Sequence, residues 1–306
     1  MTQQMIGVAA SGRIAVGLVE GCELVAPIFR FPASEEEDHA LEIHSMPMEA
    51  IAEAIAKTIA DLCNAQAAHP ATVGLGFPGI IRGGIIEESP NLKQLKGARM
   101  AESLSNALLA HGISIPVSLY NDADAMAAGI AATRGQLENL IRVWTLGHGV
   151  GYGRYPHSEG VWEGGHMVVT LDPKEDYCGC GGRGHLEGIM GHRAMRLRFL
   201  DLEPDEIFAN ARQRERDQRC EEFELFWHRA LAAASATSIH LDGPGKFFIS
   251  GPNSRFIRVS LLSQYLHEMV TMSTLQGSLF EVVPTNDEIA IVGAAVNASR
   301  ALQKDA

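Results

Sequence analysis

The chain has 306 residues, of which 46% are hydrophobic, and a net charge of −12, which together indicate one large globular domain or two lobes. The negative charge disfavours non-specific binding to nucleic acid or to anionic membranes. There is no run of 18 apolar residues and no secretory pattern at residues 1–4, so neither a membrane span nor secretion is predicted. Five cysteines, two of them clustered, favour a reducing cytoplasm over a disulfide framework.

Alternating strand and helix patterns over residues 1–120 predict a small mixed α/β lobe. Its predicted strands are residues 5–9, 14–19, 24–29, 73–77 and 116–120, with a hairpin turning at Gly83-Gly84. One predicted helix begins near Ser45, which can cap it, with Pro47 in its first turn. A second predicted helix covers residues 101–110.

A larger α/β lobe is predicted over residues 121–287. Its predicted strands are residues 141–146, 150–155 and 246–250, and its predicted helices are residues 122–133, four segments from 191 to about 240, and most of 254–272. The last helix, about 288–306, begins at a Thr285-x-x-Glu288 capping box and is expected to pack back on the first lobe. The strand-rich start of each half is a coarse duplication, and we expect no helix-turn-helix segment for DNA binding.

Metal-ligating side chains are concentrated between residues 163 and 187. Two thiols and two imidazoles, from His166, Cys178, Cys180 and His185, form a Cys2His2 set that suits a closed structural zinc site. The Cys-x-Cys spacing is tighter than the usual Cys-x2-Cys knuckle. Two buried free cysteines beside two surface histidines are the alternative interpretation.

The same stretch resembles the signature of the ROK family of sugar kinases, Glu-x-Gly-His followed by Cys-x-Cys-Gly-x-x-Gly-Cys-x-Glu. The residues on this pattern are Glu163, His166, Cys178, Cys180 and Glu187, and His185 stands where the family usually has a third cysteine. The resemblance implies a two-lobed actin-like (ribonuclease H-like) α/β sugar kinase fold with a structural Zn²⁺ loop. It also implies a homodimer formed through the large lobe.

Asp122 follows a predicted strand at the start of a helix, where a carboxylate can act as a base or simply cap the helix. The segment Asn121-Asp122-Ala123-Asp124 resembles the family's Asn-Asp-Ala-Asn, which implies that Asp122 is the catalytic base. Segments like Gly-x-Pro-Gly and Pro-Asn-Leu imply further sugar contacts. The residues predicted to bind the sugar are Gly79, Asn91, Asn121, Asp122, Glu163, His166 and Glu187.

The nucleotide half departs from the family pattern. Ala9 stands where the first phosphate loop, Asp-x-Gly-Gly-Thr-Lys, would have its magnesium-binding Asp, and Pro252 removes an amide donor from the adenosine loop. The second phosphate loop matches better, with His148 in place of Thr. The residues predicted to contact the nucleotide are Ser11, Gly12, Arg13, Thr145, Gly147, His148, Gly149, Gly251 and Gly293.

Three functions are compatible with these residues. The first is a glucokinase-like enzyme that phosphorylates a hexose or N-acetylhexosamine with ATP and Mg²⁺. The second is a sugar-binding regulatory protein with weak or no catalysis, and the third is a kinase with another donor, such as polyphosphate. The expected partners are therefore a sugar and ATP, without nucleic acid or membrane.

Overall fold

The computed structural model describes residues 3–10, 13–32, 43, 45–89, 92–158, 160, 163–215 and 217–304. The chain forms two compact units: unit 1 comprises Met1–Ile141, Gly153–Val161 and Asn286–Ala306, and unit 2 comprises Arg142–Tyr152 and Trp162–Thr285. The division falls later than the boundary predicted at residue 120, because the helix after that residue packs against the last helix. The assignment of lobes stays a prediction.

Unit 1 is built on a six-stranded sheet with the order β3-β2-β1-β5-β8, in which β4 also pairs with β2. β1 is antiparallel to β2 and parallel to β5, and β5 is parallel to β8. The strands are β1 (Gln4–Ala10), β2 (Ile14–Glu20), β3 (Glu23–Leu24), β4 (Phe29–Phe31), β5 (Val73–Phe77) and β8 (Val117–Asn121). The single strand predicted at 24–29 is wrong, since the chain leaves the sheet between β3 and β4.

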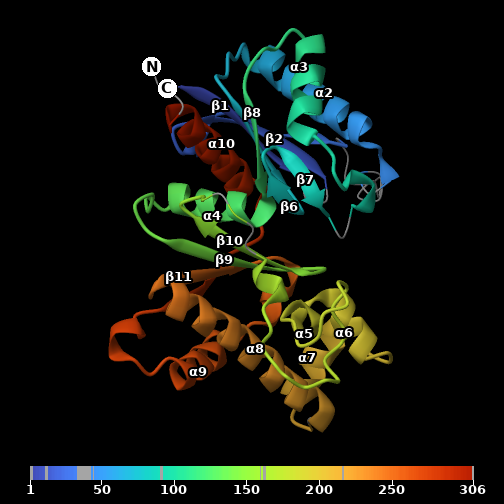
Figure 1. The fold of residues 1–306 in the computed structure, drawn as a ribbon, viewed down its shortest axis with the longest axis vertical. Coiled ribbons are helices and arrows are strands. Elements are labelled where there is room, and N and C mark those ends of the chain that lie inside the picture. Colours follow the sequence, from blue (N-terminus) through green and yellow to red (C-terminus); the bar gives the residue numbers. More distant parts are fainter. Residues whose placement is uncertain are drawn as a thin grey trace. The chain divides into compact units, whose positions relative to one another are not determined.

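Helices cover both faces of this sheet (Figure 1). Successive residues of β1 point to opposite sides: Ile6 and Val8 join the core that includes Ile51 of α2 (Met48–Gln66), whereas Met5 packs with Ile291 of α10 (Asp287–Lys304). The first face also carries α3 (Met100–Ala110), and α4 (Asp122–Thr133) lies beside α10. A hairpin of β6 (Ile80–Arg82) and β7 (Ile85–Glu88) confirms the turn predicted at Gly83-Gly84.

Helix α10 approaches its neighbours at backbone distance, which only glycine permits. A Cβ atom on Gly293 would lie 1.8 Å from the Ala125 carbonyl oxygen of α4, and one on Gly7 would lie 1.9 Å from the Ile291 carbonyl oxygen. The helix does not begin at the predicted capping box. Asn286 caps it instead, by accepting the Glu288 N–H at 2.8 Å.

Unit 2 combines helices with most of a four-stranded sheet, in the order β10-β9-β11-β12; Ile141 of β9 and the last three residues of β10 fall in unit 1. The strands are β9 (Ile141–Leu146), β10 (Val150–Tyr155), β11 (Lys246–Ser250) and β12 (Leu279–Val282). The helices are α5 (Glu187–Met190), α6 (His192–Arg198), α7 (Pro204–Arg212), α8 (Gln218–Asp242) and α9 (Val259–Met269). Predicted helix 254–272 is shorter at its start, because Pro252–Phe256 form a 3-10 turn.

Large aromatic side chains fill the core of unit 2. Trp144 of β9 and Trp227 of α8 are fully buried, and the Phe208 and Phe256 rings stack with centroids 4.2 Å apart. In the part of the chain that the structure describes, no helix is long and apolar enough to cross a membrane.

Candidate functional site

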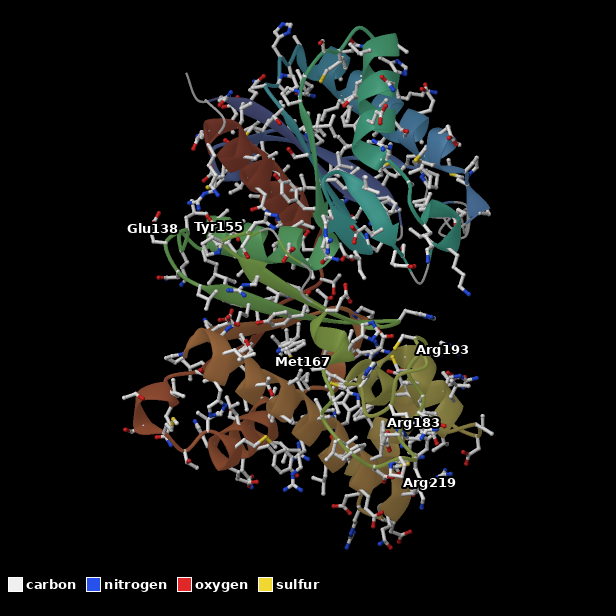
Figure 2. The ribbon with its side chains drawn as sticks, viewed as in Figure 1. Glu138, Tyr155, Met167, Arg183, Arg193 and Arg219 are labelled. Carbon is white, nitrogen blue, oxygen red and sulfur yellow. The ribbon has the colours of Figure 1, made fainter. Side chains whose placement is uncertain are left out.

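Backbone pairing folds the segment 163–187 back on itself, so that residues beside Met167 pair with residues beyond Arg183. Figure 2 labels both residues. The Val169 N–H donates to the Gly184 carbonyl oxygen at 2.8 Å, within a short antiparallel bridge. This pairing brings together two imidazoles that are distant in sequence.

The four predicted metal ligands form one cluster. The Cys178 Sγ atom lies 3.5 Å from the His166 Nδ1 atom, and the Cys180 Sγ atom lies 3.3 Å from the His185 Nδ1 atom. The two Nδ1 atoms are 3.3 Å apart and the two Sγ atoms 3.4 Å apart. All four donor atoms lie within 4.8 Å of one another.

This geometry fits a tetrahedral zinc ion. Zinc–sulfur bonds of about 2.3 Å and zinc–nitrogen bonds of about 2.0–2.1 Å place ligand atoms roughly 3.3–3.8 Å apart. Burial raises the pKa of the Cys178 thiol to about 12; the backbone N–H of Cys180 opposes the rise, and the Cys180 side chain and the Glu187 charge add to it. Burial, and then the nearby His166, lower the pKa of His185. The lowered pKa of His185 favours the neutral imidazole that binds metal, whereas the raised pKa of Cys178 favours the thiol, and a bound cation would shift that thiol to the thiolate.

Two of the predicted sugar ligands lie beside this cluster. The Nε2 atom of His166 lies 3.8 Å from a carboxylate oxygen of Glu163, while its Nδ1 atom faces the thiols. A carboxylate on the second ring nitrogen is the usual way to orient a metal-bound histidine. Glu187 accepts the Val150 N–H at 3.0 Å and lies against Cys178. Glu163, His166 and Glu187 are thus brought together within unit 2.

The second phosphate loop joins β9 to β10 and contains Gly147, His148 and Gly149, with Thr145 near the end of β9. The Gly147 carbonyl oxygen accepts two donors, the Asn253 amide at 2.9 Å and the His192 N–H at 3.0 Å. Sequence reasoning assigned no role to Asn253, which is almost fully buried. Its position, immediately after a strand and Gly-Pro, was the available signal.

The remaining nucleotide candidates are dispersed. Gly251 donates its N–H to the Thr285 hydroxyl at 3.1 Å. Gly293 is buried between α10 and α4, where packing alone requires glycine, so a nucleotide contact there stays a prediction. Arg13 forms an ion pair with Asp287 at 3.3 Å, and Arg30 contacts the same oxygen at 3.4 Å. Ser11, Gly12 and Asn91 lie outside the described residues.

Asp122 occupies the first turn of α4, directly after β8. The N-cap is its neighbour Asn121, whose side chain accepts the Ala123 N–H at 2.9 Å and donates to the Gly79 carbonyl oxygen at 2.9 Å. This places three of the predicted sugar residues at one end of the unit 1 sheet. The Asp122 carboxylate also accepts the Ala123 N–H, at 2.9 Å.

Burial raises the pKa of Asp122 above its ordinary value, and the charge of Asp124 raises it further, while hydrogen bonds from the backbone N–H groups of Ala123 and of Asp122 itself oppose the shift. Asp124 accepts the Arg154 N–H at 3.0 Å and lies 3.6 Å from His157. A carboxyl group with a raised pKa is better matched to proton transfer near neutral pH.

Comparison with known proteins gives this geometry a context. The model of the ROK family matches residues 28–300. A glucokinase of Pyrobaculum calidifontis is 29% identical over 195 residues, which cover 58% of this chain and 62% of the relative. An N-acetylmannosamine kinase of Haemophilus influenzae is 29% identical over 208 residues, which cover 64% of this chain and 66% of the relative. The chain thus aligns with less than two thirds of either relative's length.

A solved structure supports the fold. It is a ROK family glucokinase from Streptomyces griseus in complex with glucose and AMPPNP. The alignment covers 97% of this chain and 99% of that one, with 21% identity and a TM-score of 0.63. The predicted actin-like α/β fold class of sugar kinases is therefore confirmed.

Proposed function

Since this chain belongs to the ROK family, we propose that it phosphorylates a hexose or N-acetylhexosamine with ATP and Mg²⁺. Similarity to a glucokinase and to an N-acetylmannosamine kinase supports these sugar classes. The observation that carries the proposal is Asp122, a half-buried carboxyl group with a raised pKa at a strand–helix junction.

In the proposed reaction, the oxygen of a sugar hydroxyl attacks the terminal phosphorus of ATP, and Asp122 accepts the proton that this hydroxyl loses. The new O–P bond forms as the bond to ADP breaks, so the products are a sugar phosphate, ADP and protonated Asp122. Sugar hydroxyls are held by the amide of Asn121, the Gly79 turn and Asn91. Magnesium would neutralise phosphate charge.

On the unit 2 side, Glu163, His166 and Glu187 are the proposed acceptors for further hydroxyls. The loop residues Thr145, Gly147, His148 and Gly149, with Ser11, Gly12, Arg13, Gly251 and Gly293, are the proposed nucleotide contacts. His166, Cys178, Cys180 and His185 would hold one structural Zn²⁺. A homodimer in the cytoplasm belongs to the same proposal.

A regulatory sugar-binding protein is the second candidate, and the first phosphate loop favours it. Ala9 is 8% exposed and offers no carboxylate for magnesium. Arg13, the nearest cation of this loop among the described residues, is already paired with Asp287. A kinase that uses another phosphoryl donor, such as polyphosphate, is the third candidate that this altered phosphate loop allows.

Calorimetric titration with ATP–Mg²⁺, with and without glucose or N-acetylmannosamine, separates these candidates. The kinase requires nucleotide binding and sugar-dependent release of ADP, which Asp122→Asn should abolish while sugar binding persists. Asp61→Asn, an exposed change on α2, is the control. Tight sugar binding without phosphorylated product from ATP, GTP or polyphosphate would favour the regulatory protein.

A further inference from the structure

The carboxylate of Glu187 contacts both the phosphate loop and the Cys–His cluster. Its Oε2 atom accepts the N–H of Val150, the residue directly after the loop, at 3.0 Å. Its Oε1 atom lies 3.8 Å from the Sγ atom of Cys178, one of the four cluster residues. All these residues belong to unit 2.

The contact on the loop side is tight. A Cβ atom on Gly149 would lie 2.3 Å from the Glu187 Oε2 atom, so even one methyl group would displace the carboxylate. The main chain of Glu187 also holds this region, since its carbonyl oxygen accepts the Gly191 N–H at 2.9 Å. A Cβ atom on Gly191 would in turn lie 3.0 Å from the His148 carbonyl oxygen.

We propose that Glu187 is a positioning residue that couples the Cys–His cluster to the phosphate loop 147–149, so that metal and nucleotide strengthen each other's binding. The nucleotide in this statement rests on the proposed function. The coupling itself concerns only the cluster, Glu187 and the loop.

The physical reason is the shared side chain. With a cation held by the four ligands, the Cys178 sulfur is fixed, and the carboxylate packed against it has fewer orientations. Val150 then keeps its acceptor, and the loop keeps the conformation that presents its amides. Coupling between two binding sites is reciprocal. A change in the loop that displaces the Glu187 carboxylate is therefore expected to weaken zinc binding as well.

The first test disturbs the loop and reads the metal. At equilibrium with a competing chelator, Gly149→Ala should release zinc more readily, with a zinc affinity about 5-fold lower than that of wild type or lower still, although residue 149 is not a ligand. Gly147→Ala is the matched control in the same loop, because its Cβ atom would meet only Pro252, at an ordinary 3.6 Å. Equal release from wild type and Gly149→Ala would overturn the proposal.

The second test disturbs the metal and reads the loop. Removal of zinc should speed amide hydrogen exchange at 147–151 by about 5-fold or more in wild type. Zinc-loaded Glu187→Ala should already exchange fast there, and Glu187→Gln, which keeps an acceptor oxygen, should respond less than wild type. Amide exchange rates at 147–151 that change neither on removal of zinc nor on substitution of Glu187 would contradict the coupling. If zinc-free protein unfolds, the release assay decides.

A third measurement keeps this inference apart from the proposed function. ATP–Mg²⁺ should bind zinc-loaded wild type about 5-fold more tightly than Glu187→Gln or better. Equal affinities would overturn the coupling. If wild type binds no nucleotide at all, the proposed kinase fails, and the release and exchange assays still decide the role of Glu187.

Discussion

The carboxylate of Asp122, the proposed catalytic base, is expected to lower the stability of the folded protein at neutral pH. Burial and Asp124 raise its pKa in the folded chain above its unfolded value. Stability from such a group is fully present below the unfolded pKa, about 3.9, and is lost as pH rises through the folded pKa. Asp122→Asn should therefore melt at a higher temperature than wild type at pH 7, and the difference should shrink toward pH 4. Melting curves across this range check it, with Asp61→Asn as control; a lower melting temperature at pH 7 would contradict the shift.

At the scale of elements, the loop that carries the Cys–His cluster is expected to depend on its four candidate ligands and on an ion pair to α6. Cys178→Ser should reduce zinc from about one equivalent per chain to well under half, because it removes the buried thiol of a four-ligand set. Metal analysis of protein purified without chelator tests this, and Cys63→Ser, outside the cluster, is the control. A fully stable wild type without metal would refute the zinc site.

Arg198 of α6 holds the segment that leads into the cluster. It forms a two-pronged ion pair with Glu175, at 2.9 Å for one contact, and lies over the Tyr177 ring. The side chains of Arg198 and Glu175 are only 17% and 9% exposed. Arg198→Ala should therefore lower the free energy of unfolding by about 3–5 kcal/mol, because it leaves a buried carboxylate unpaired. Arg219, which is labelled in Figure 2, forms an exposed ion pair with Asp201, and Arg219→Ala should change the stability little. Chemical denaturation compares them, and equal losses would count against this role.

Most elements could be predicted from sequence because hydrophobic periodicity is local. The strands at 73–77 and 141–146 lie where their apolar runs predict them. Contacts between distant residues could not be predicted, such as the pair of Arg13 with Asp287, 274 positions apart. The four residues of the Cys–His cluster could be picked out from the sequence because residue type and spacing carry metal-binding chemistry. The acceptor role of Glu187 toward Val150 has no sequence signal, because it depends on where two loops meet.

At the scale of the whole molecule, α10 completes unit 1 from the far end of the sequence. Gly293→Ala should destabilise the protein by about 1–3 kcal/mol, because the added methyl group forces α10 away from α4. Gly277→Ala is the control, since its Cβ atom would meet nothing within 4 Å. Thermal unfolding of the two variants tests the contrast, and similar stabilities would argue against backbone-close packing.

Because α10 joins unit 1 only from the far end of the sequence, its late docking has a consequence for protein synthesis. On the ribosome, β1 and β2 emerge early, but α10, the helix that covers one of their faces, emerges only after all of unit 2. At about 5–20 residues per second, that face stays uncovered for many seconds. Met5, Ala9 and Val19 are among the side chains left without their partner. The nascent chain is therefore expected to need protection from aggregation, such as chaperone binding, until its final helix docks.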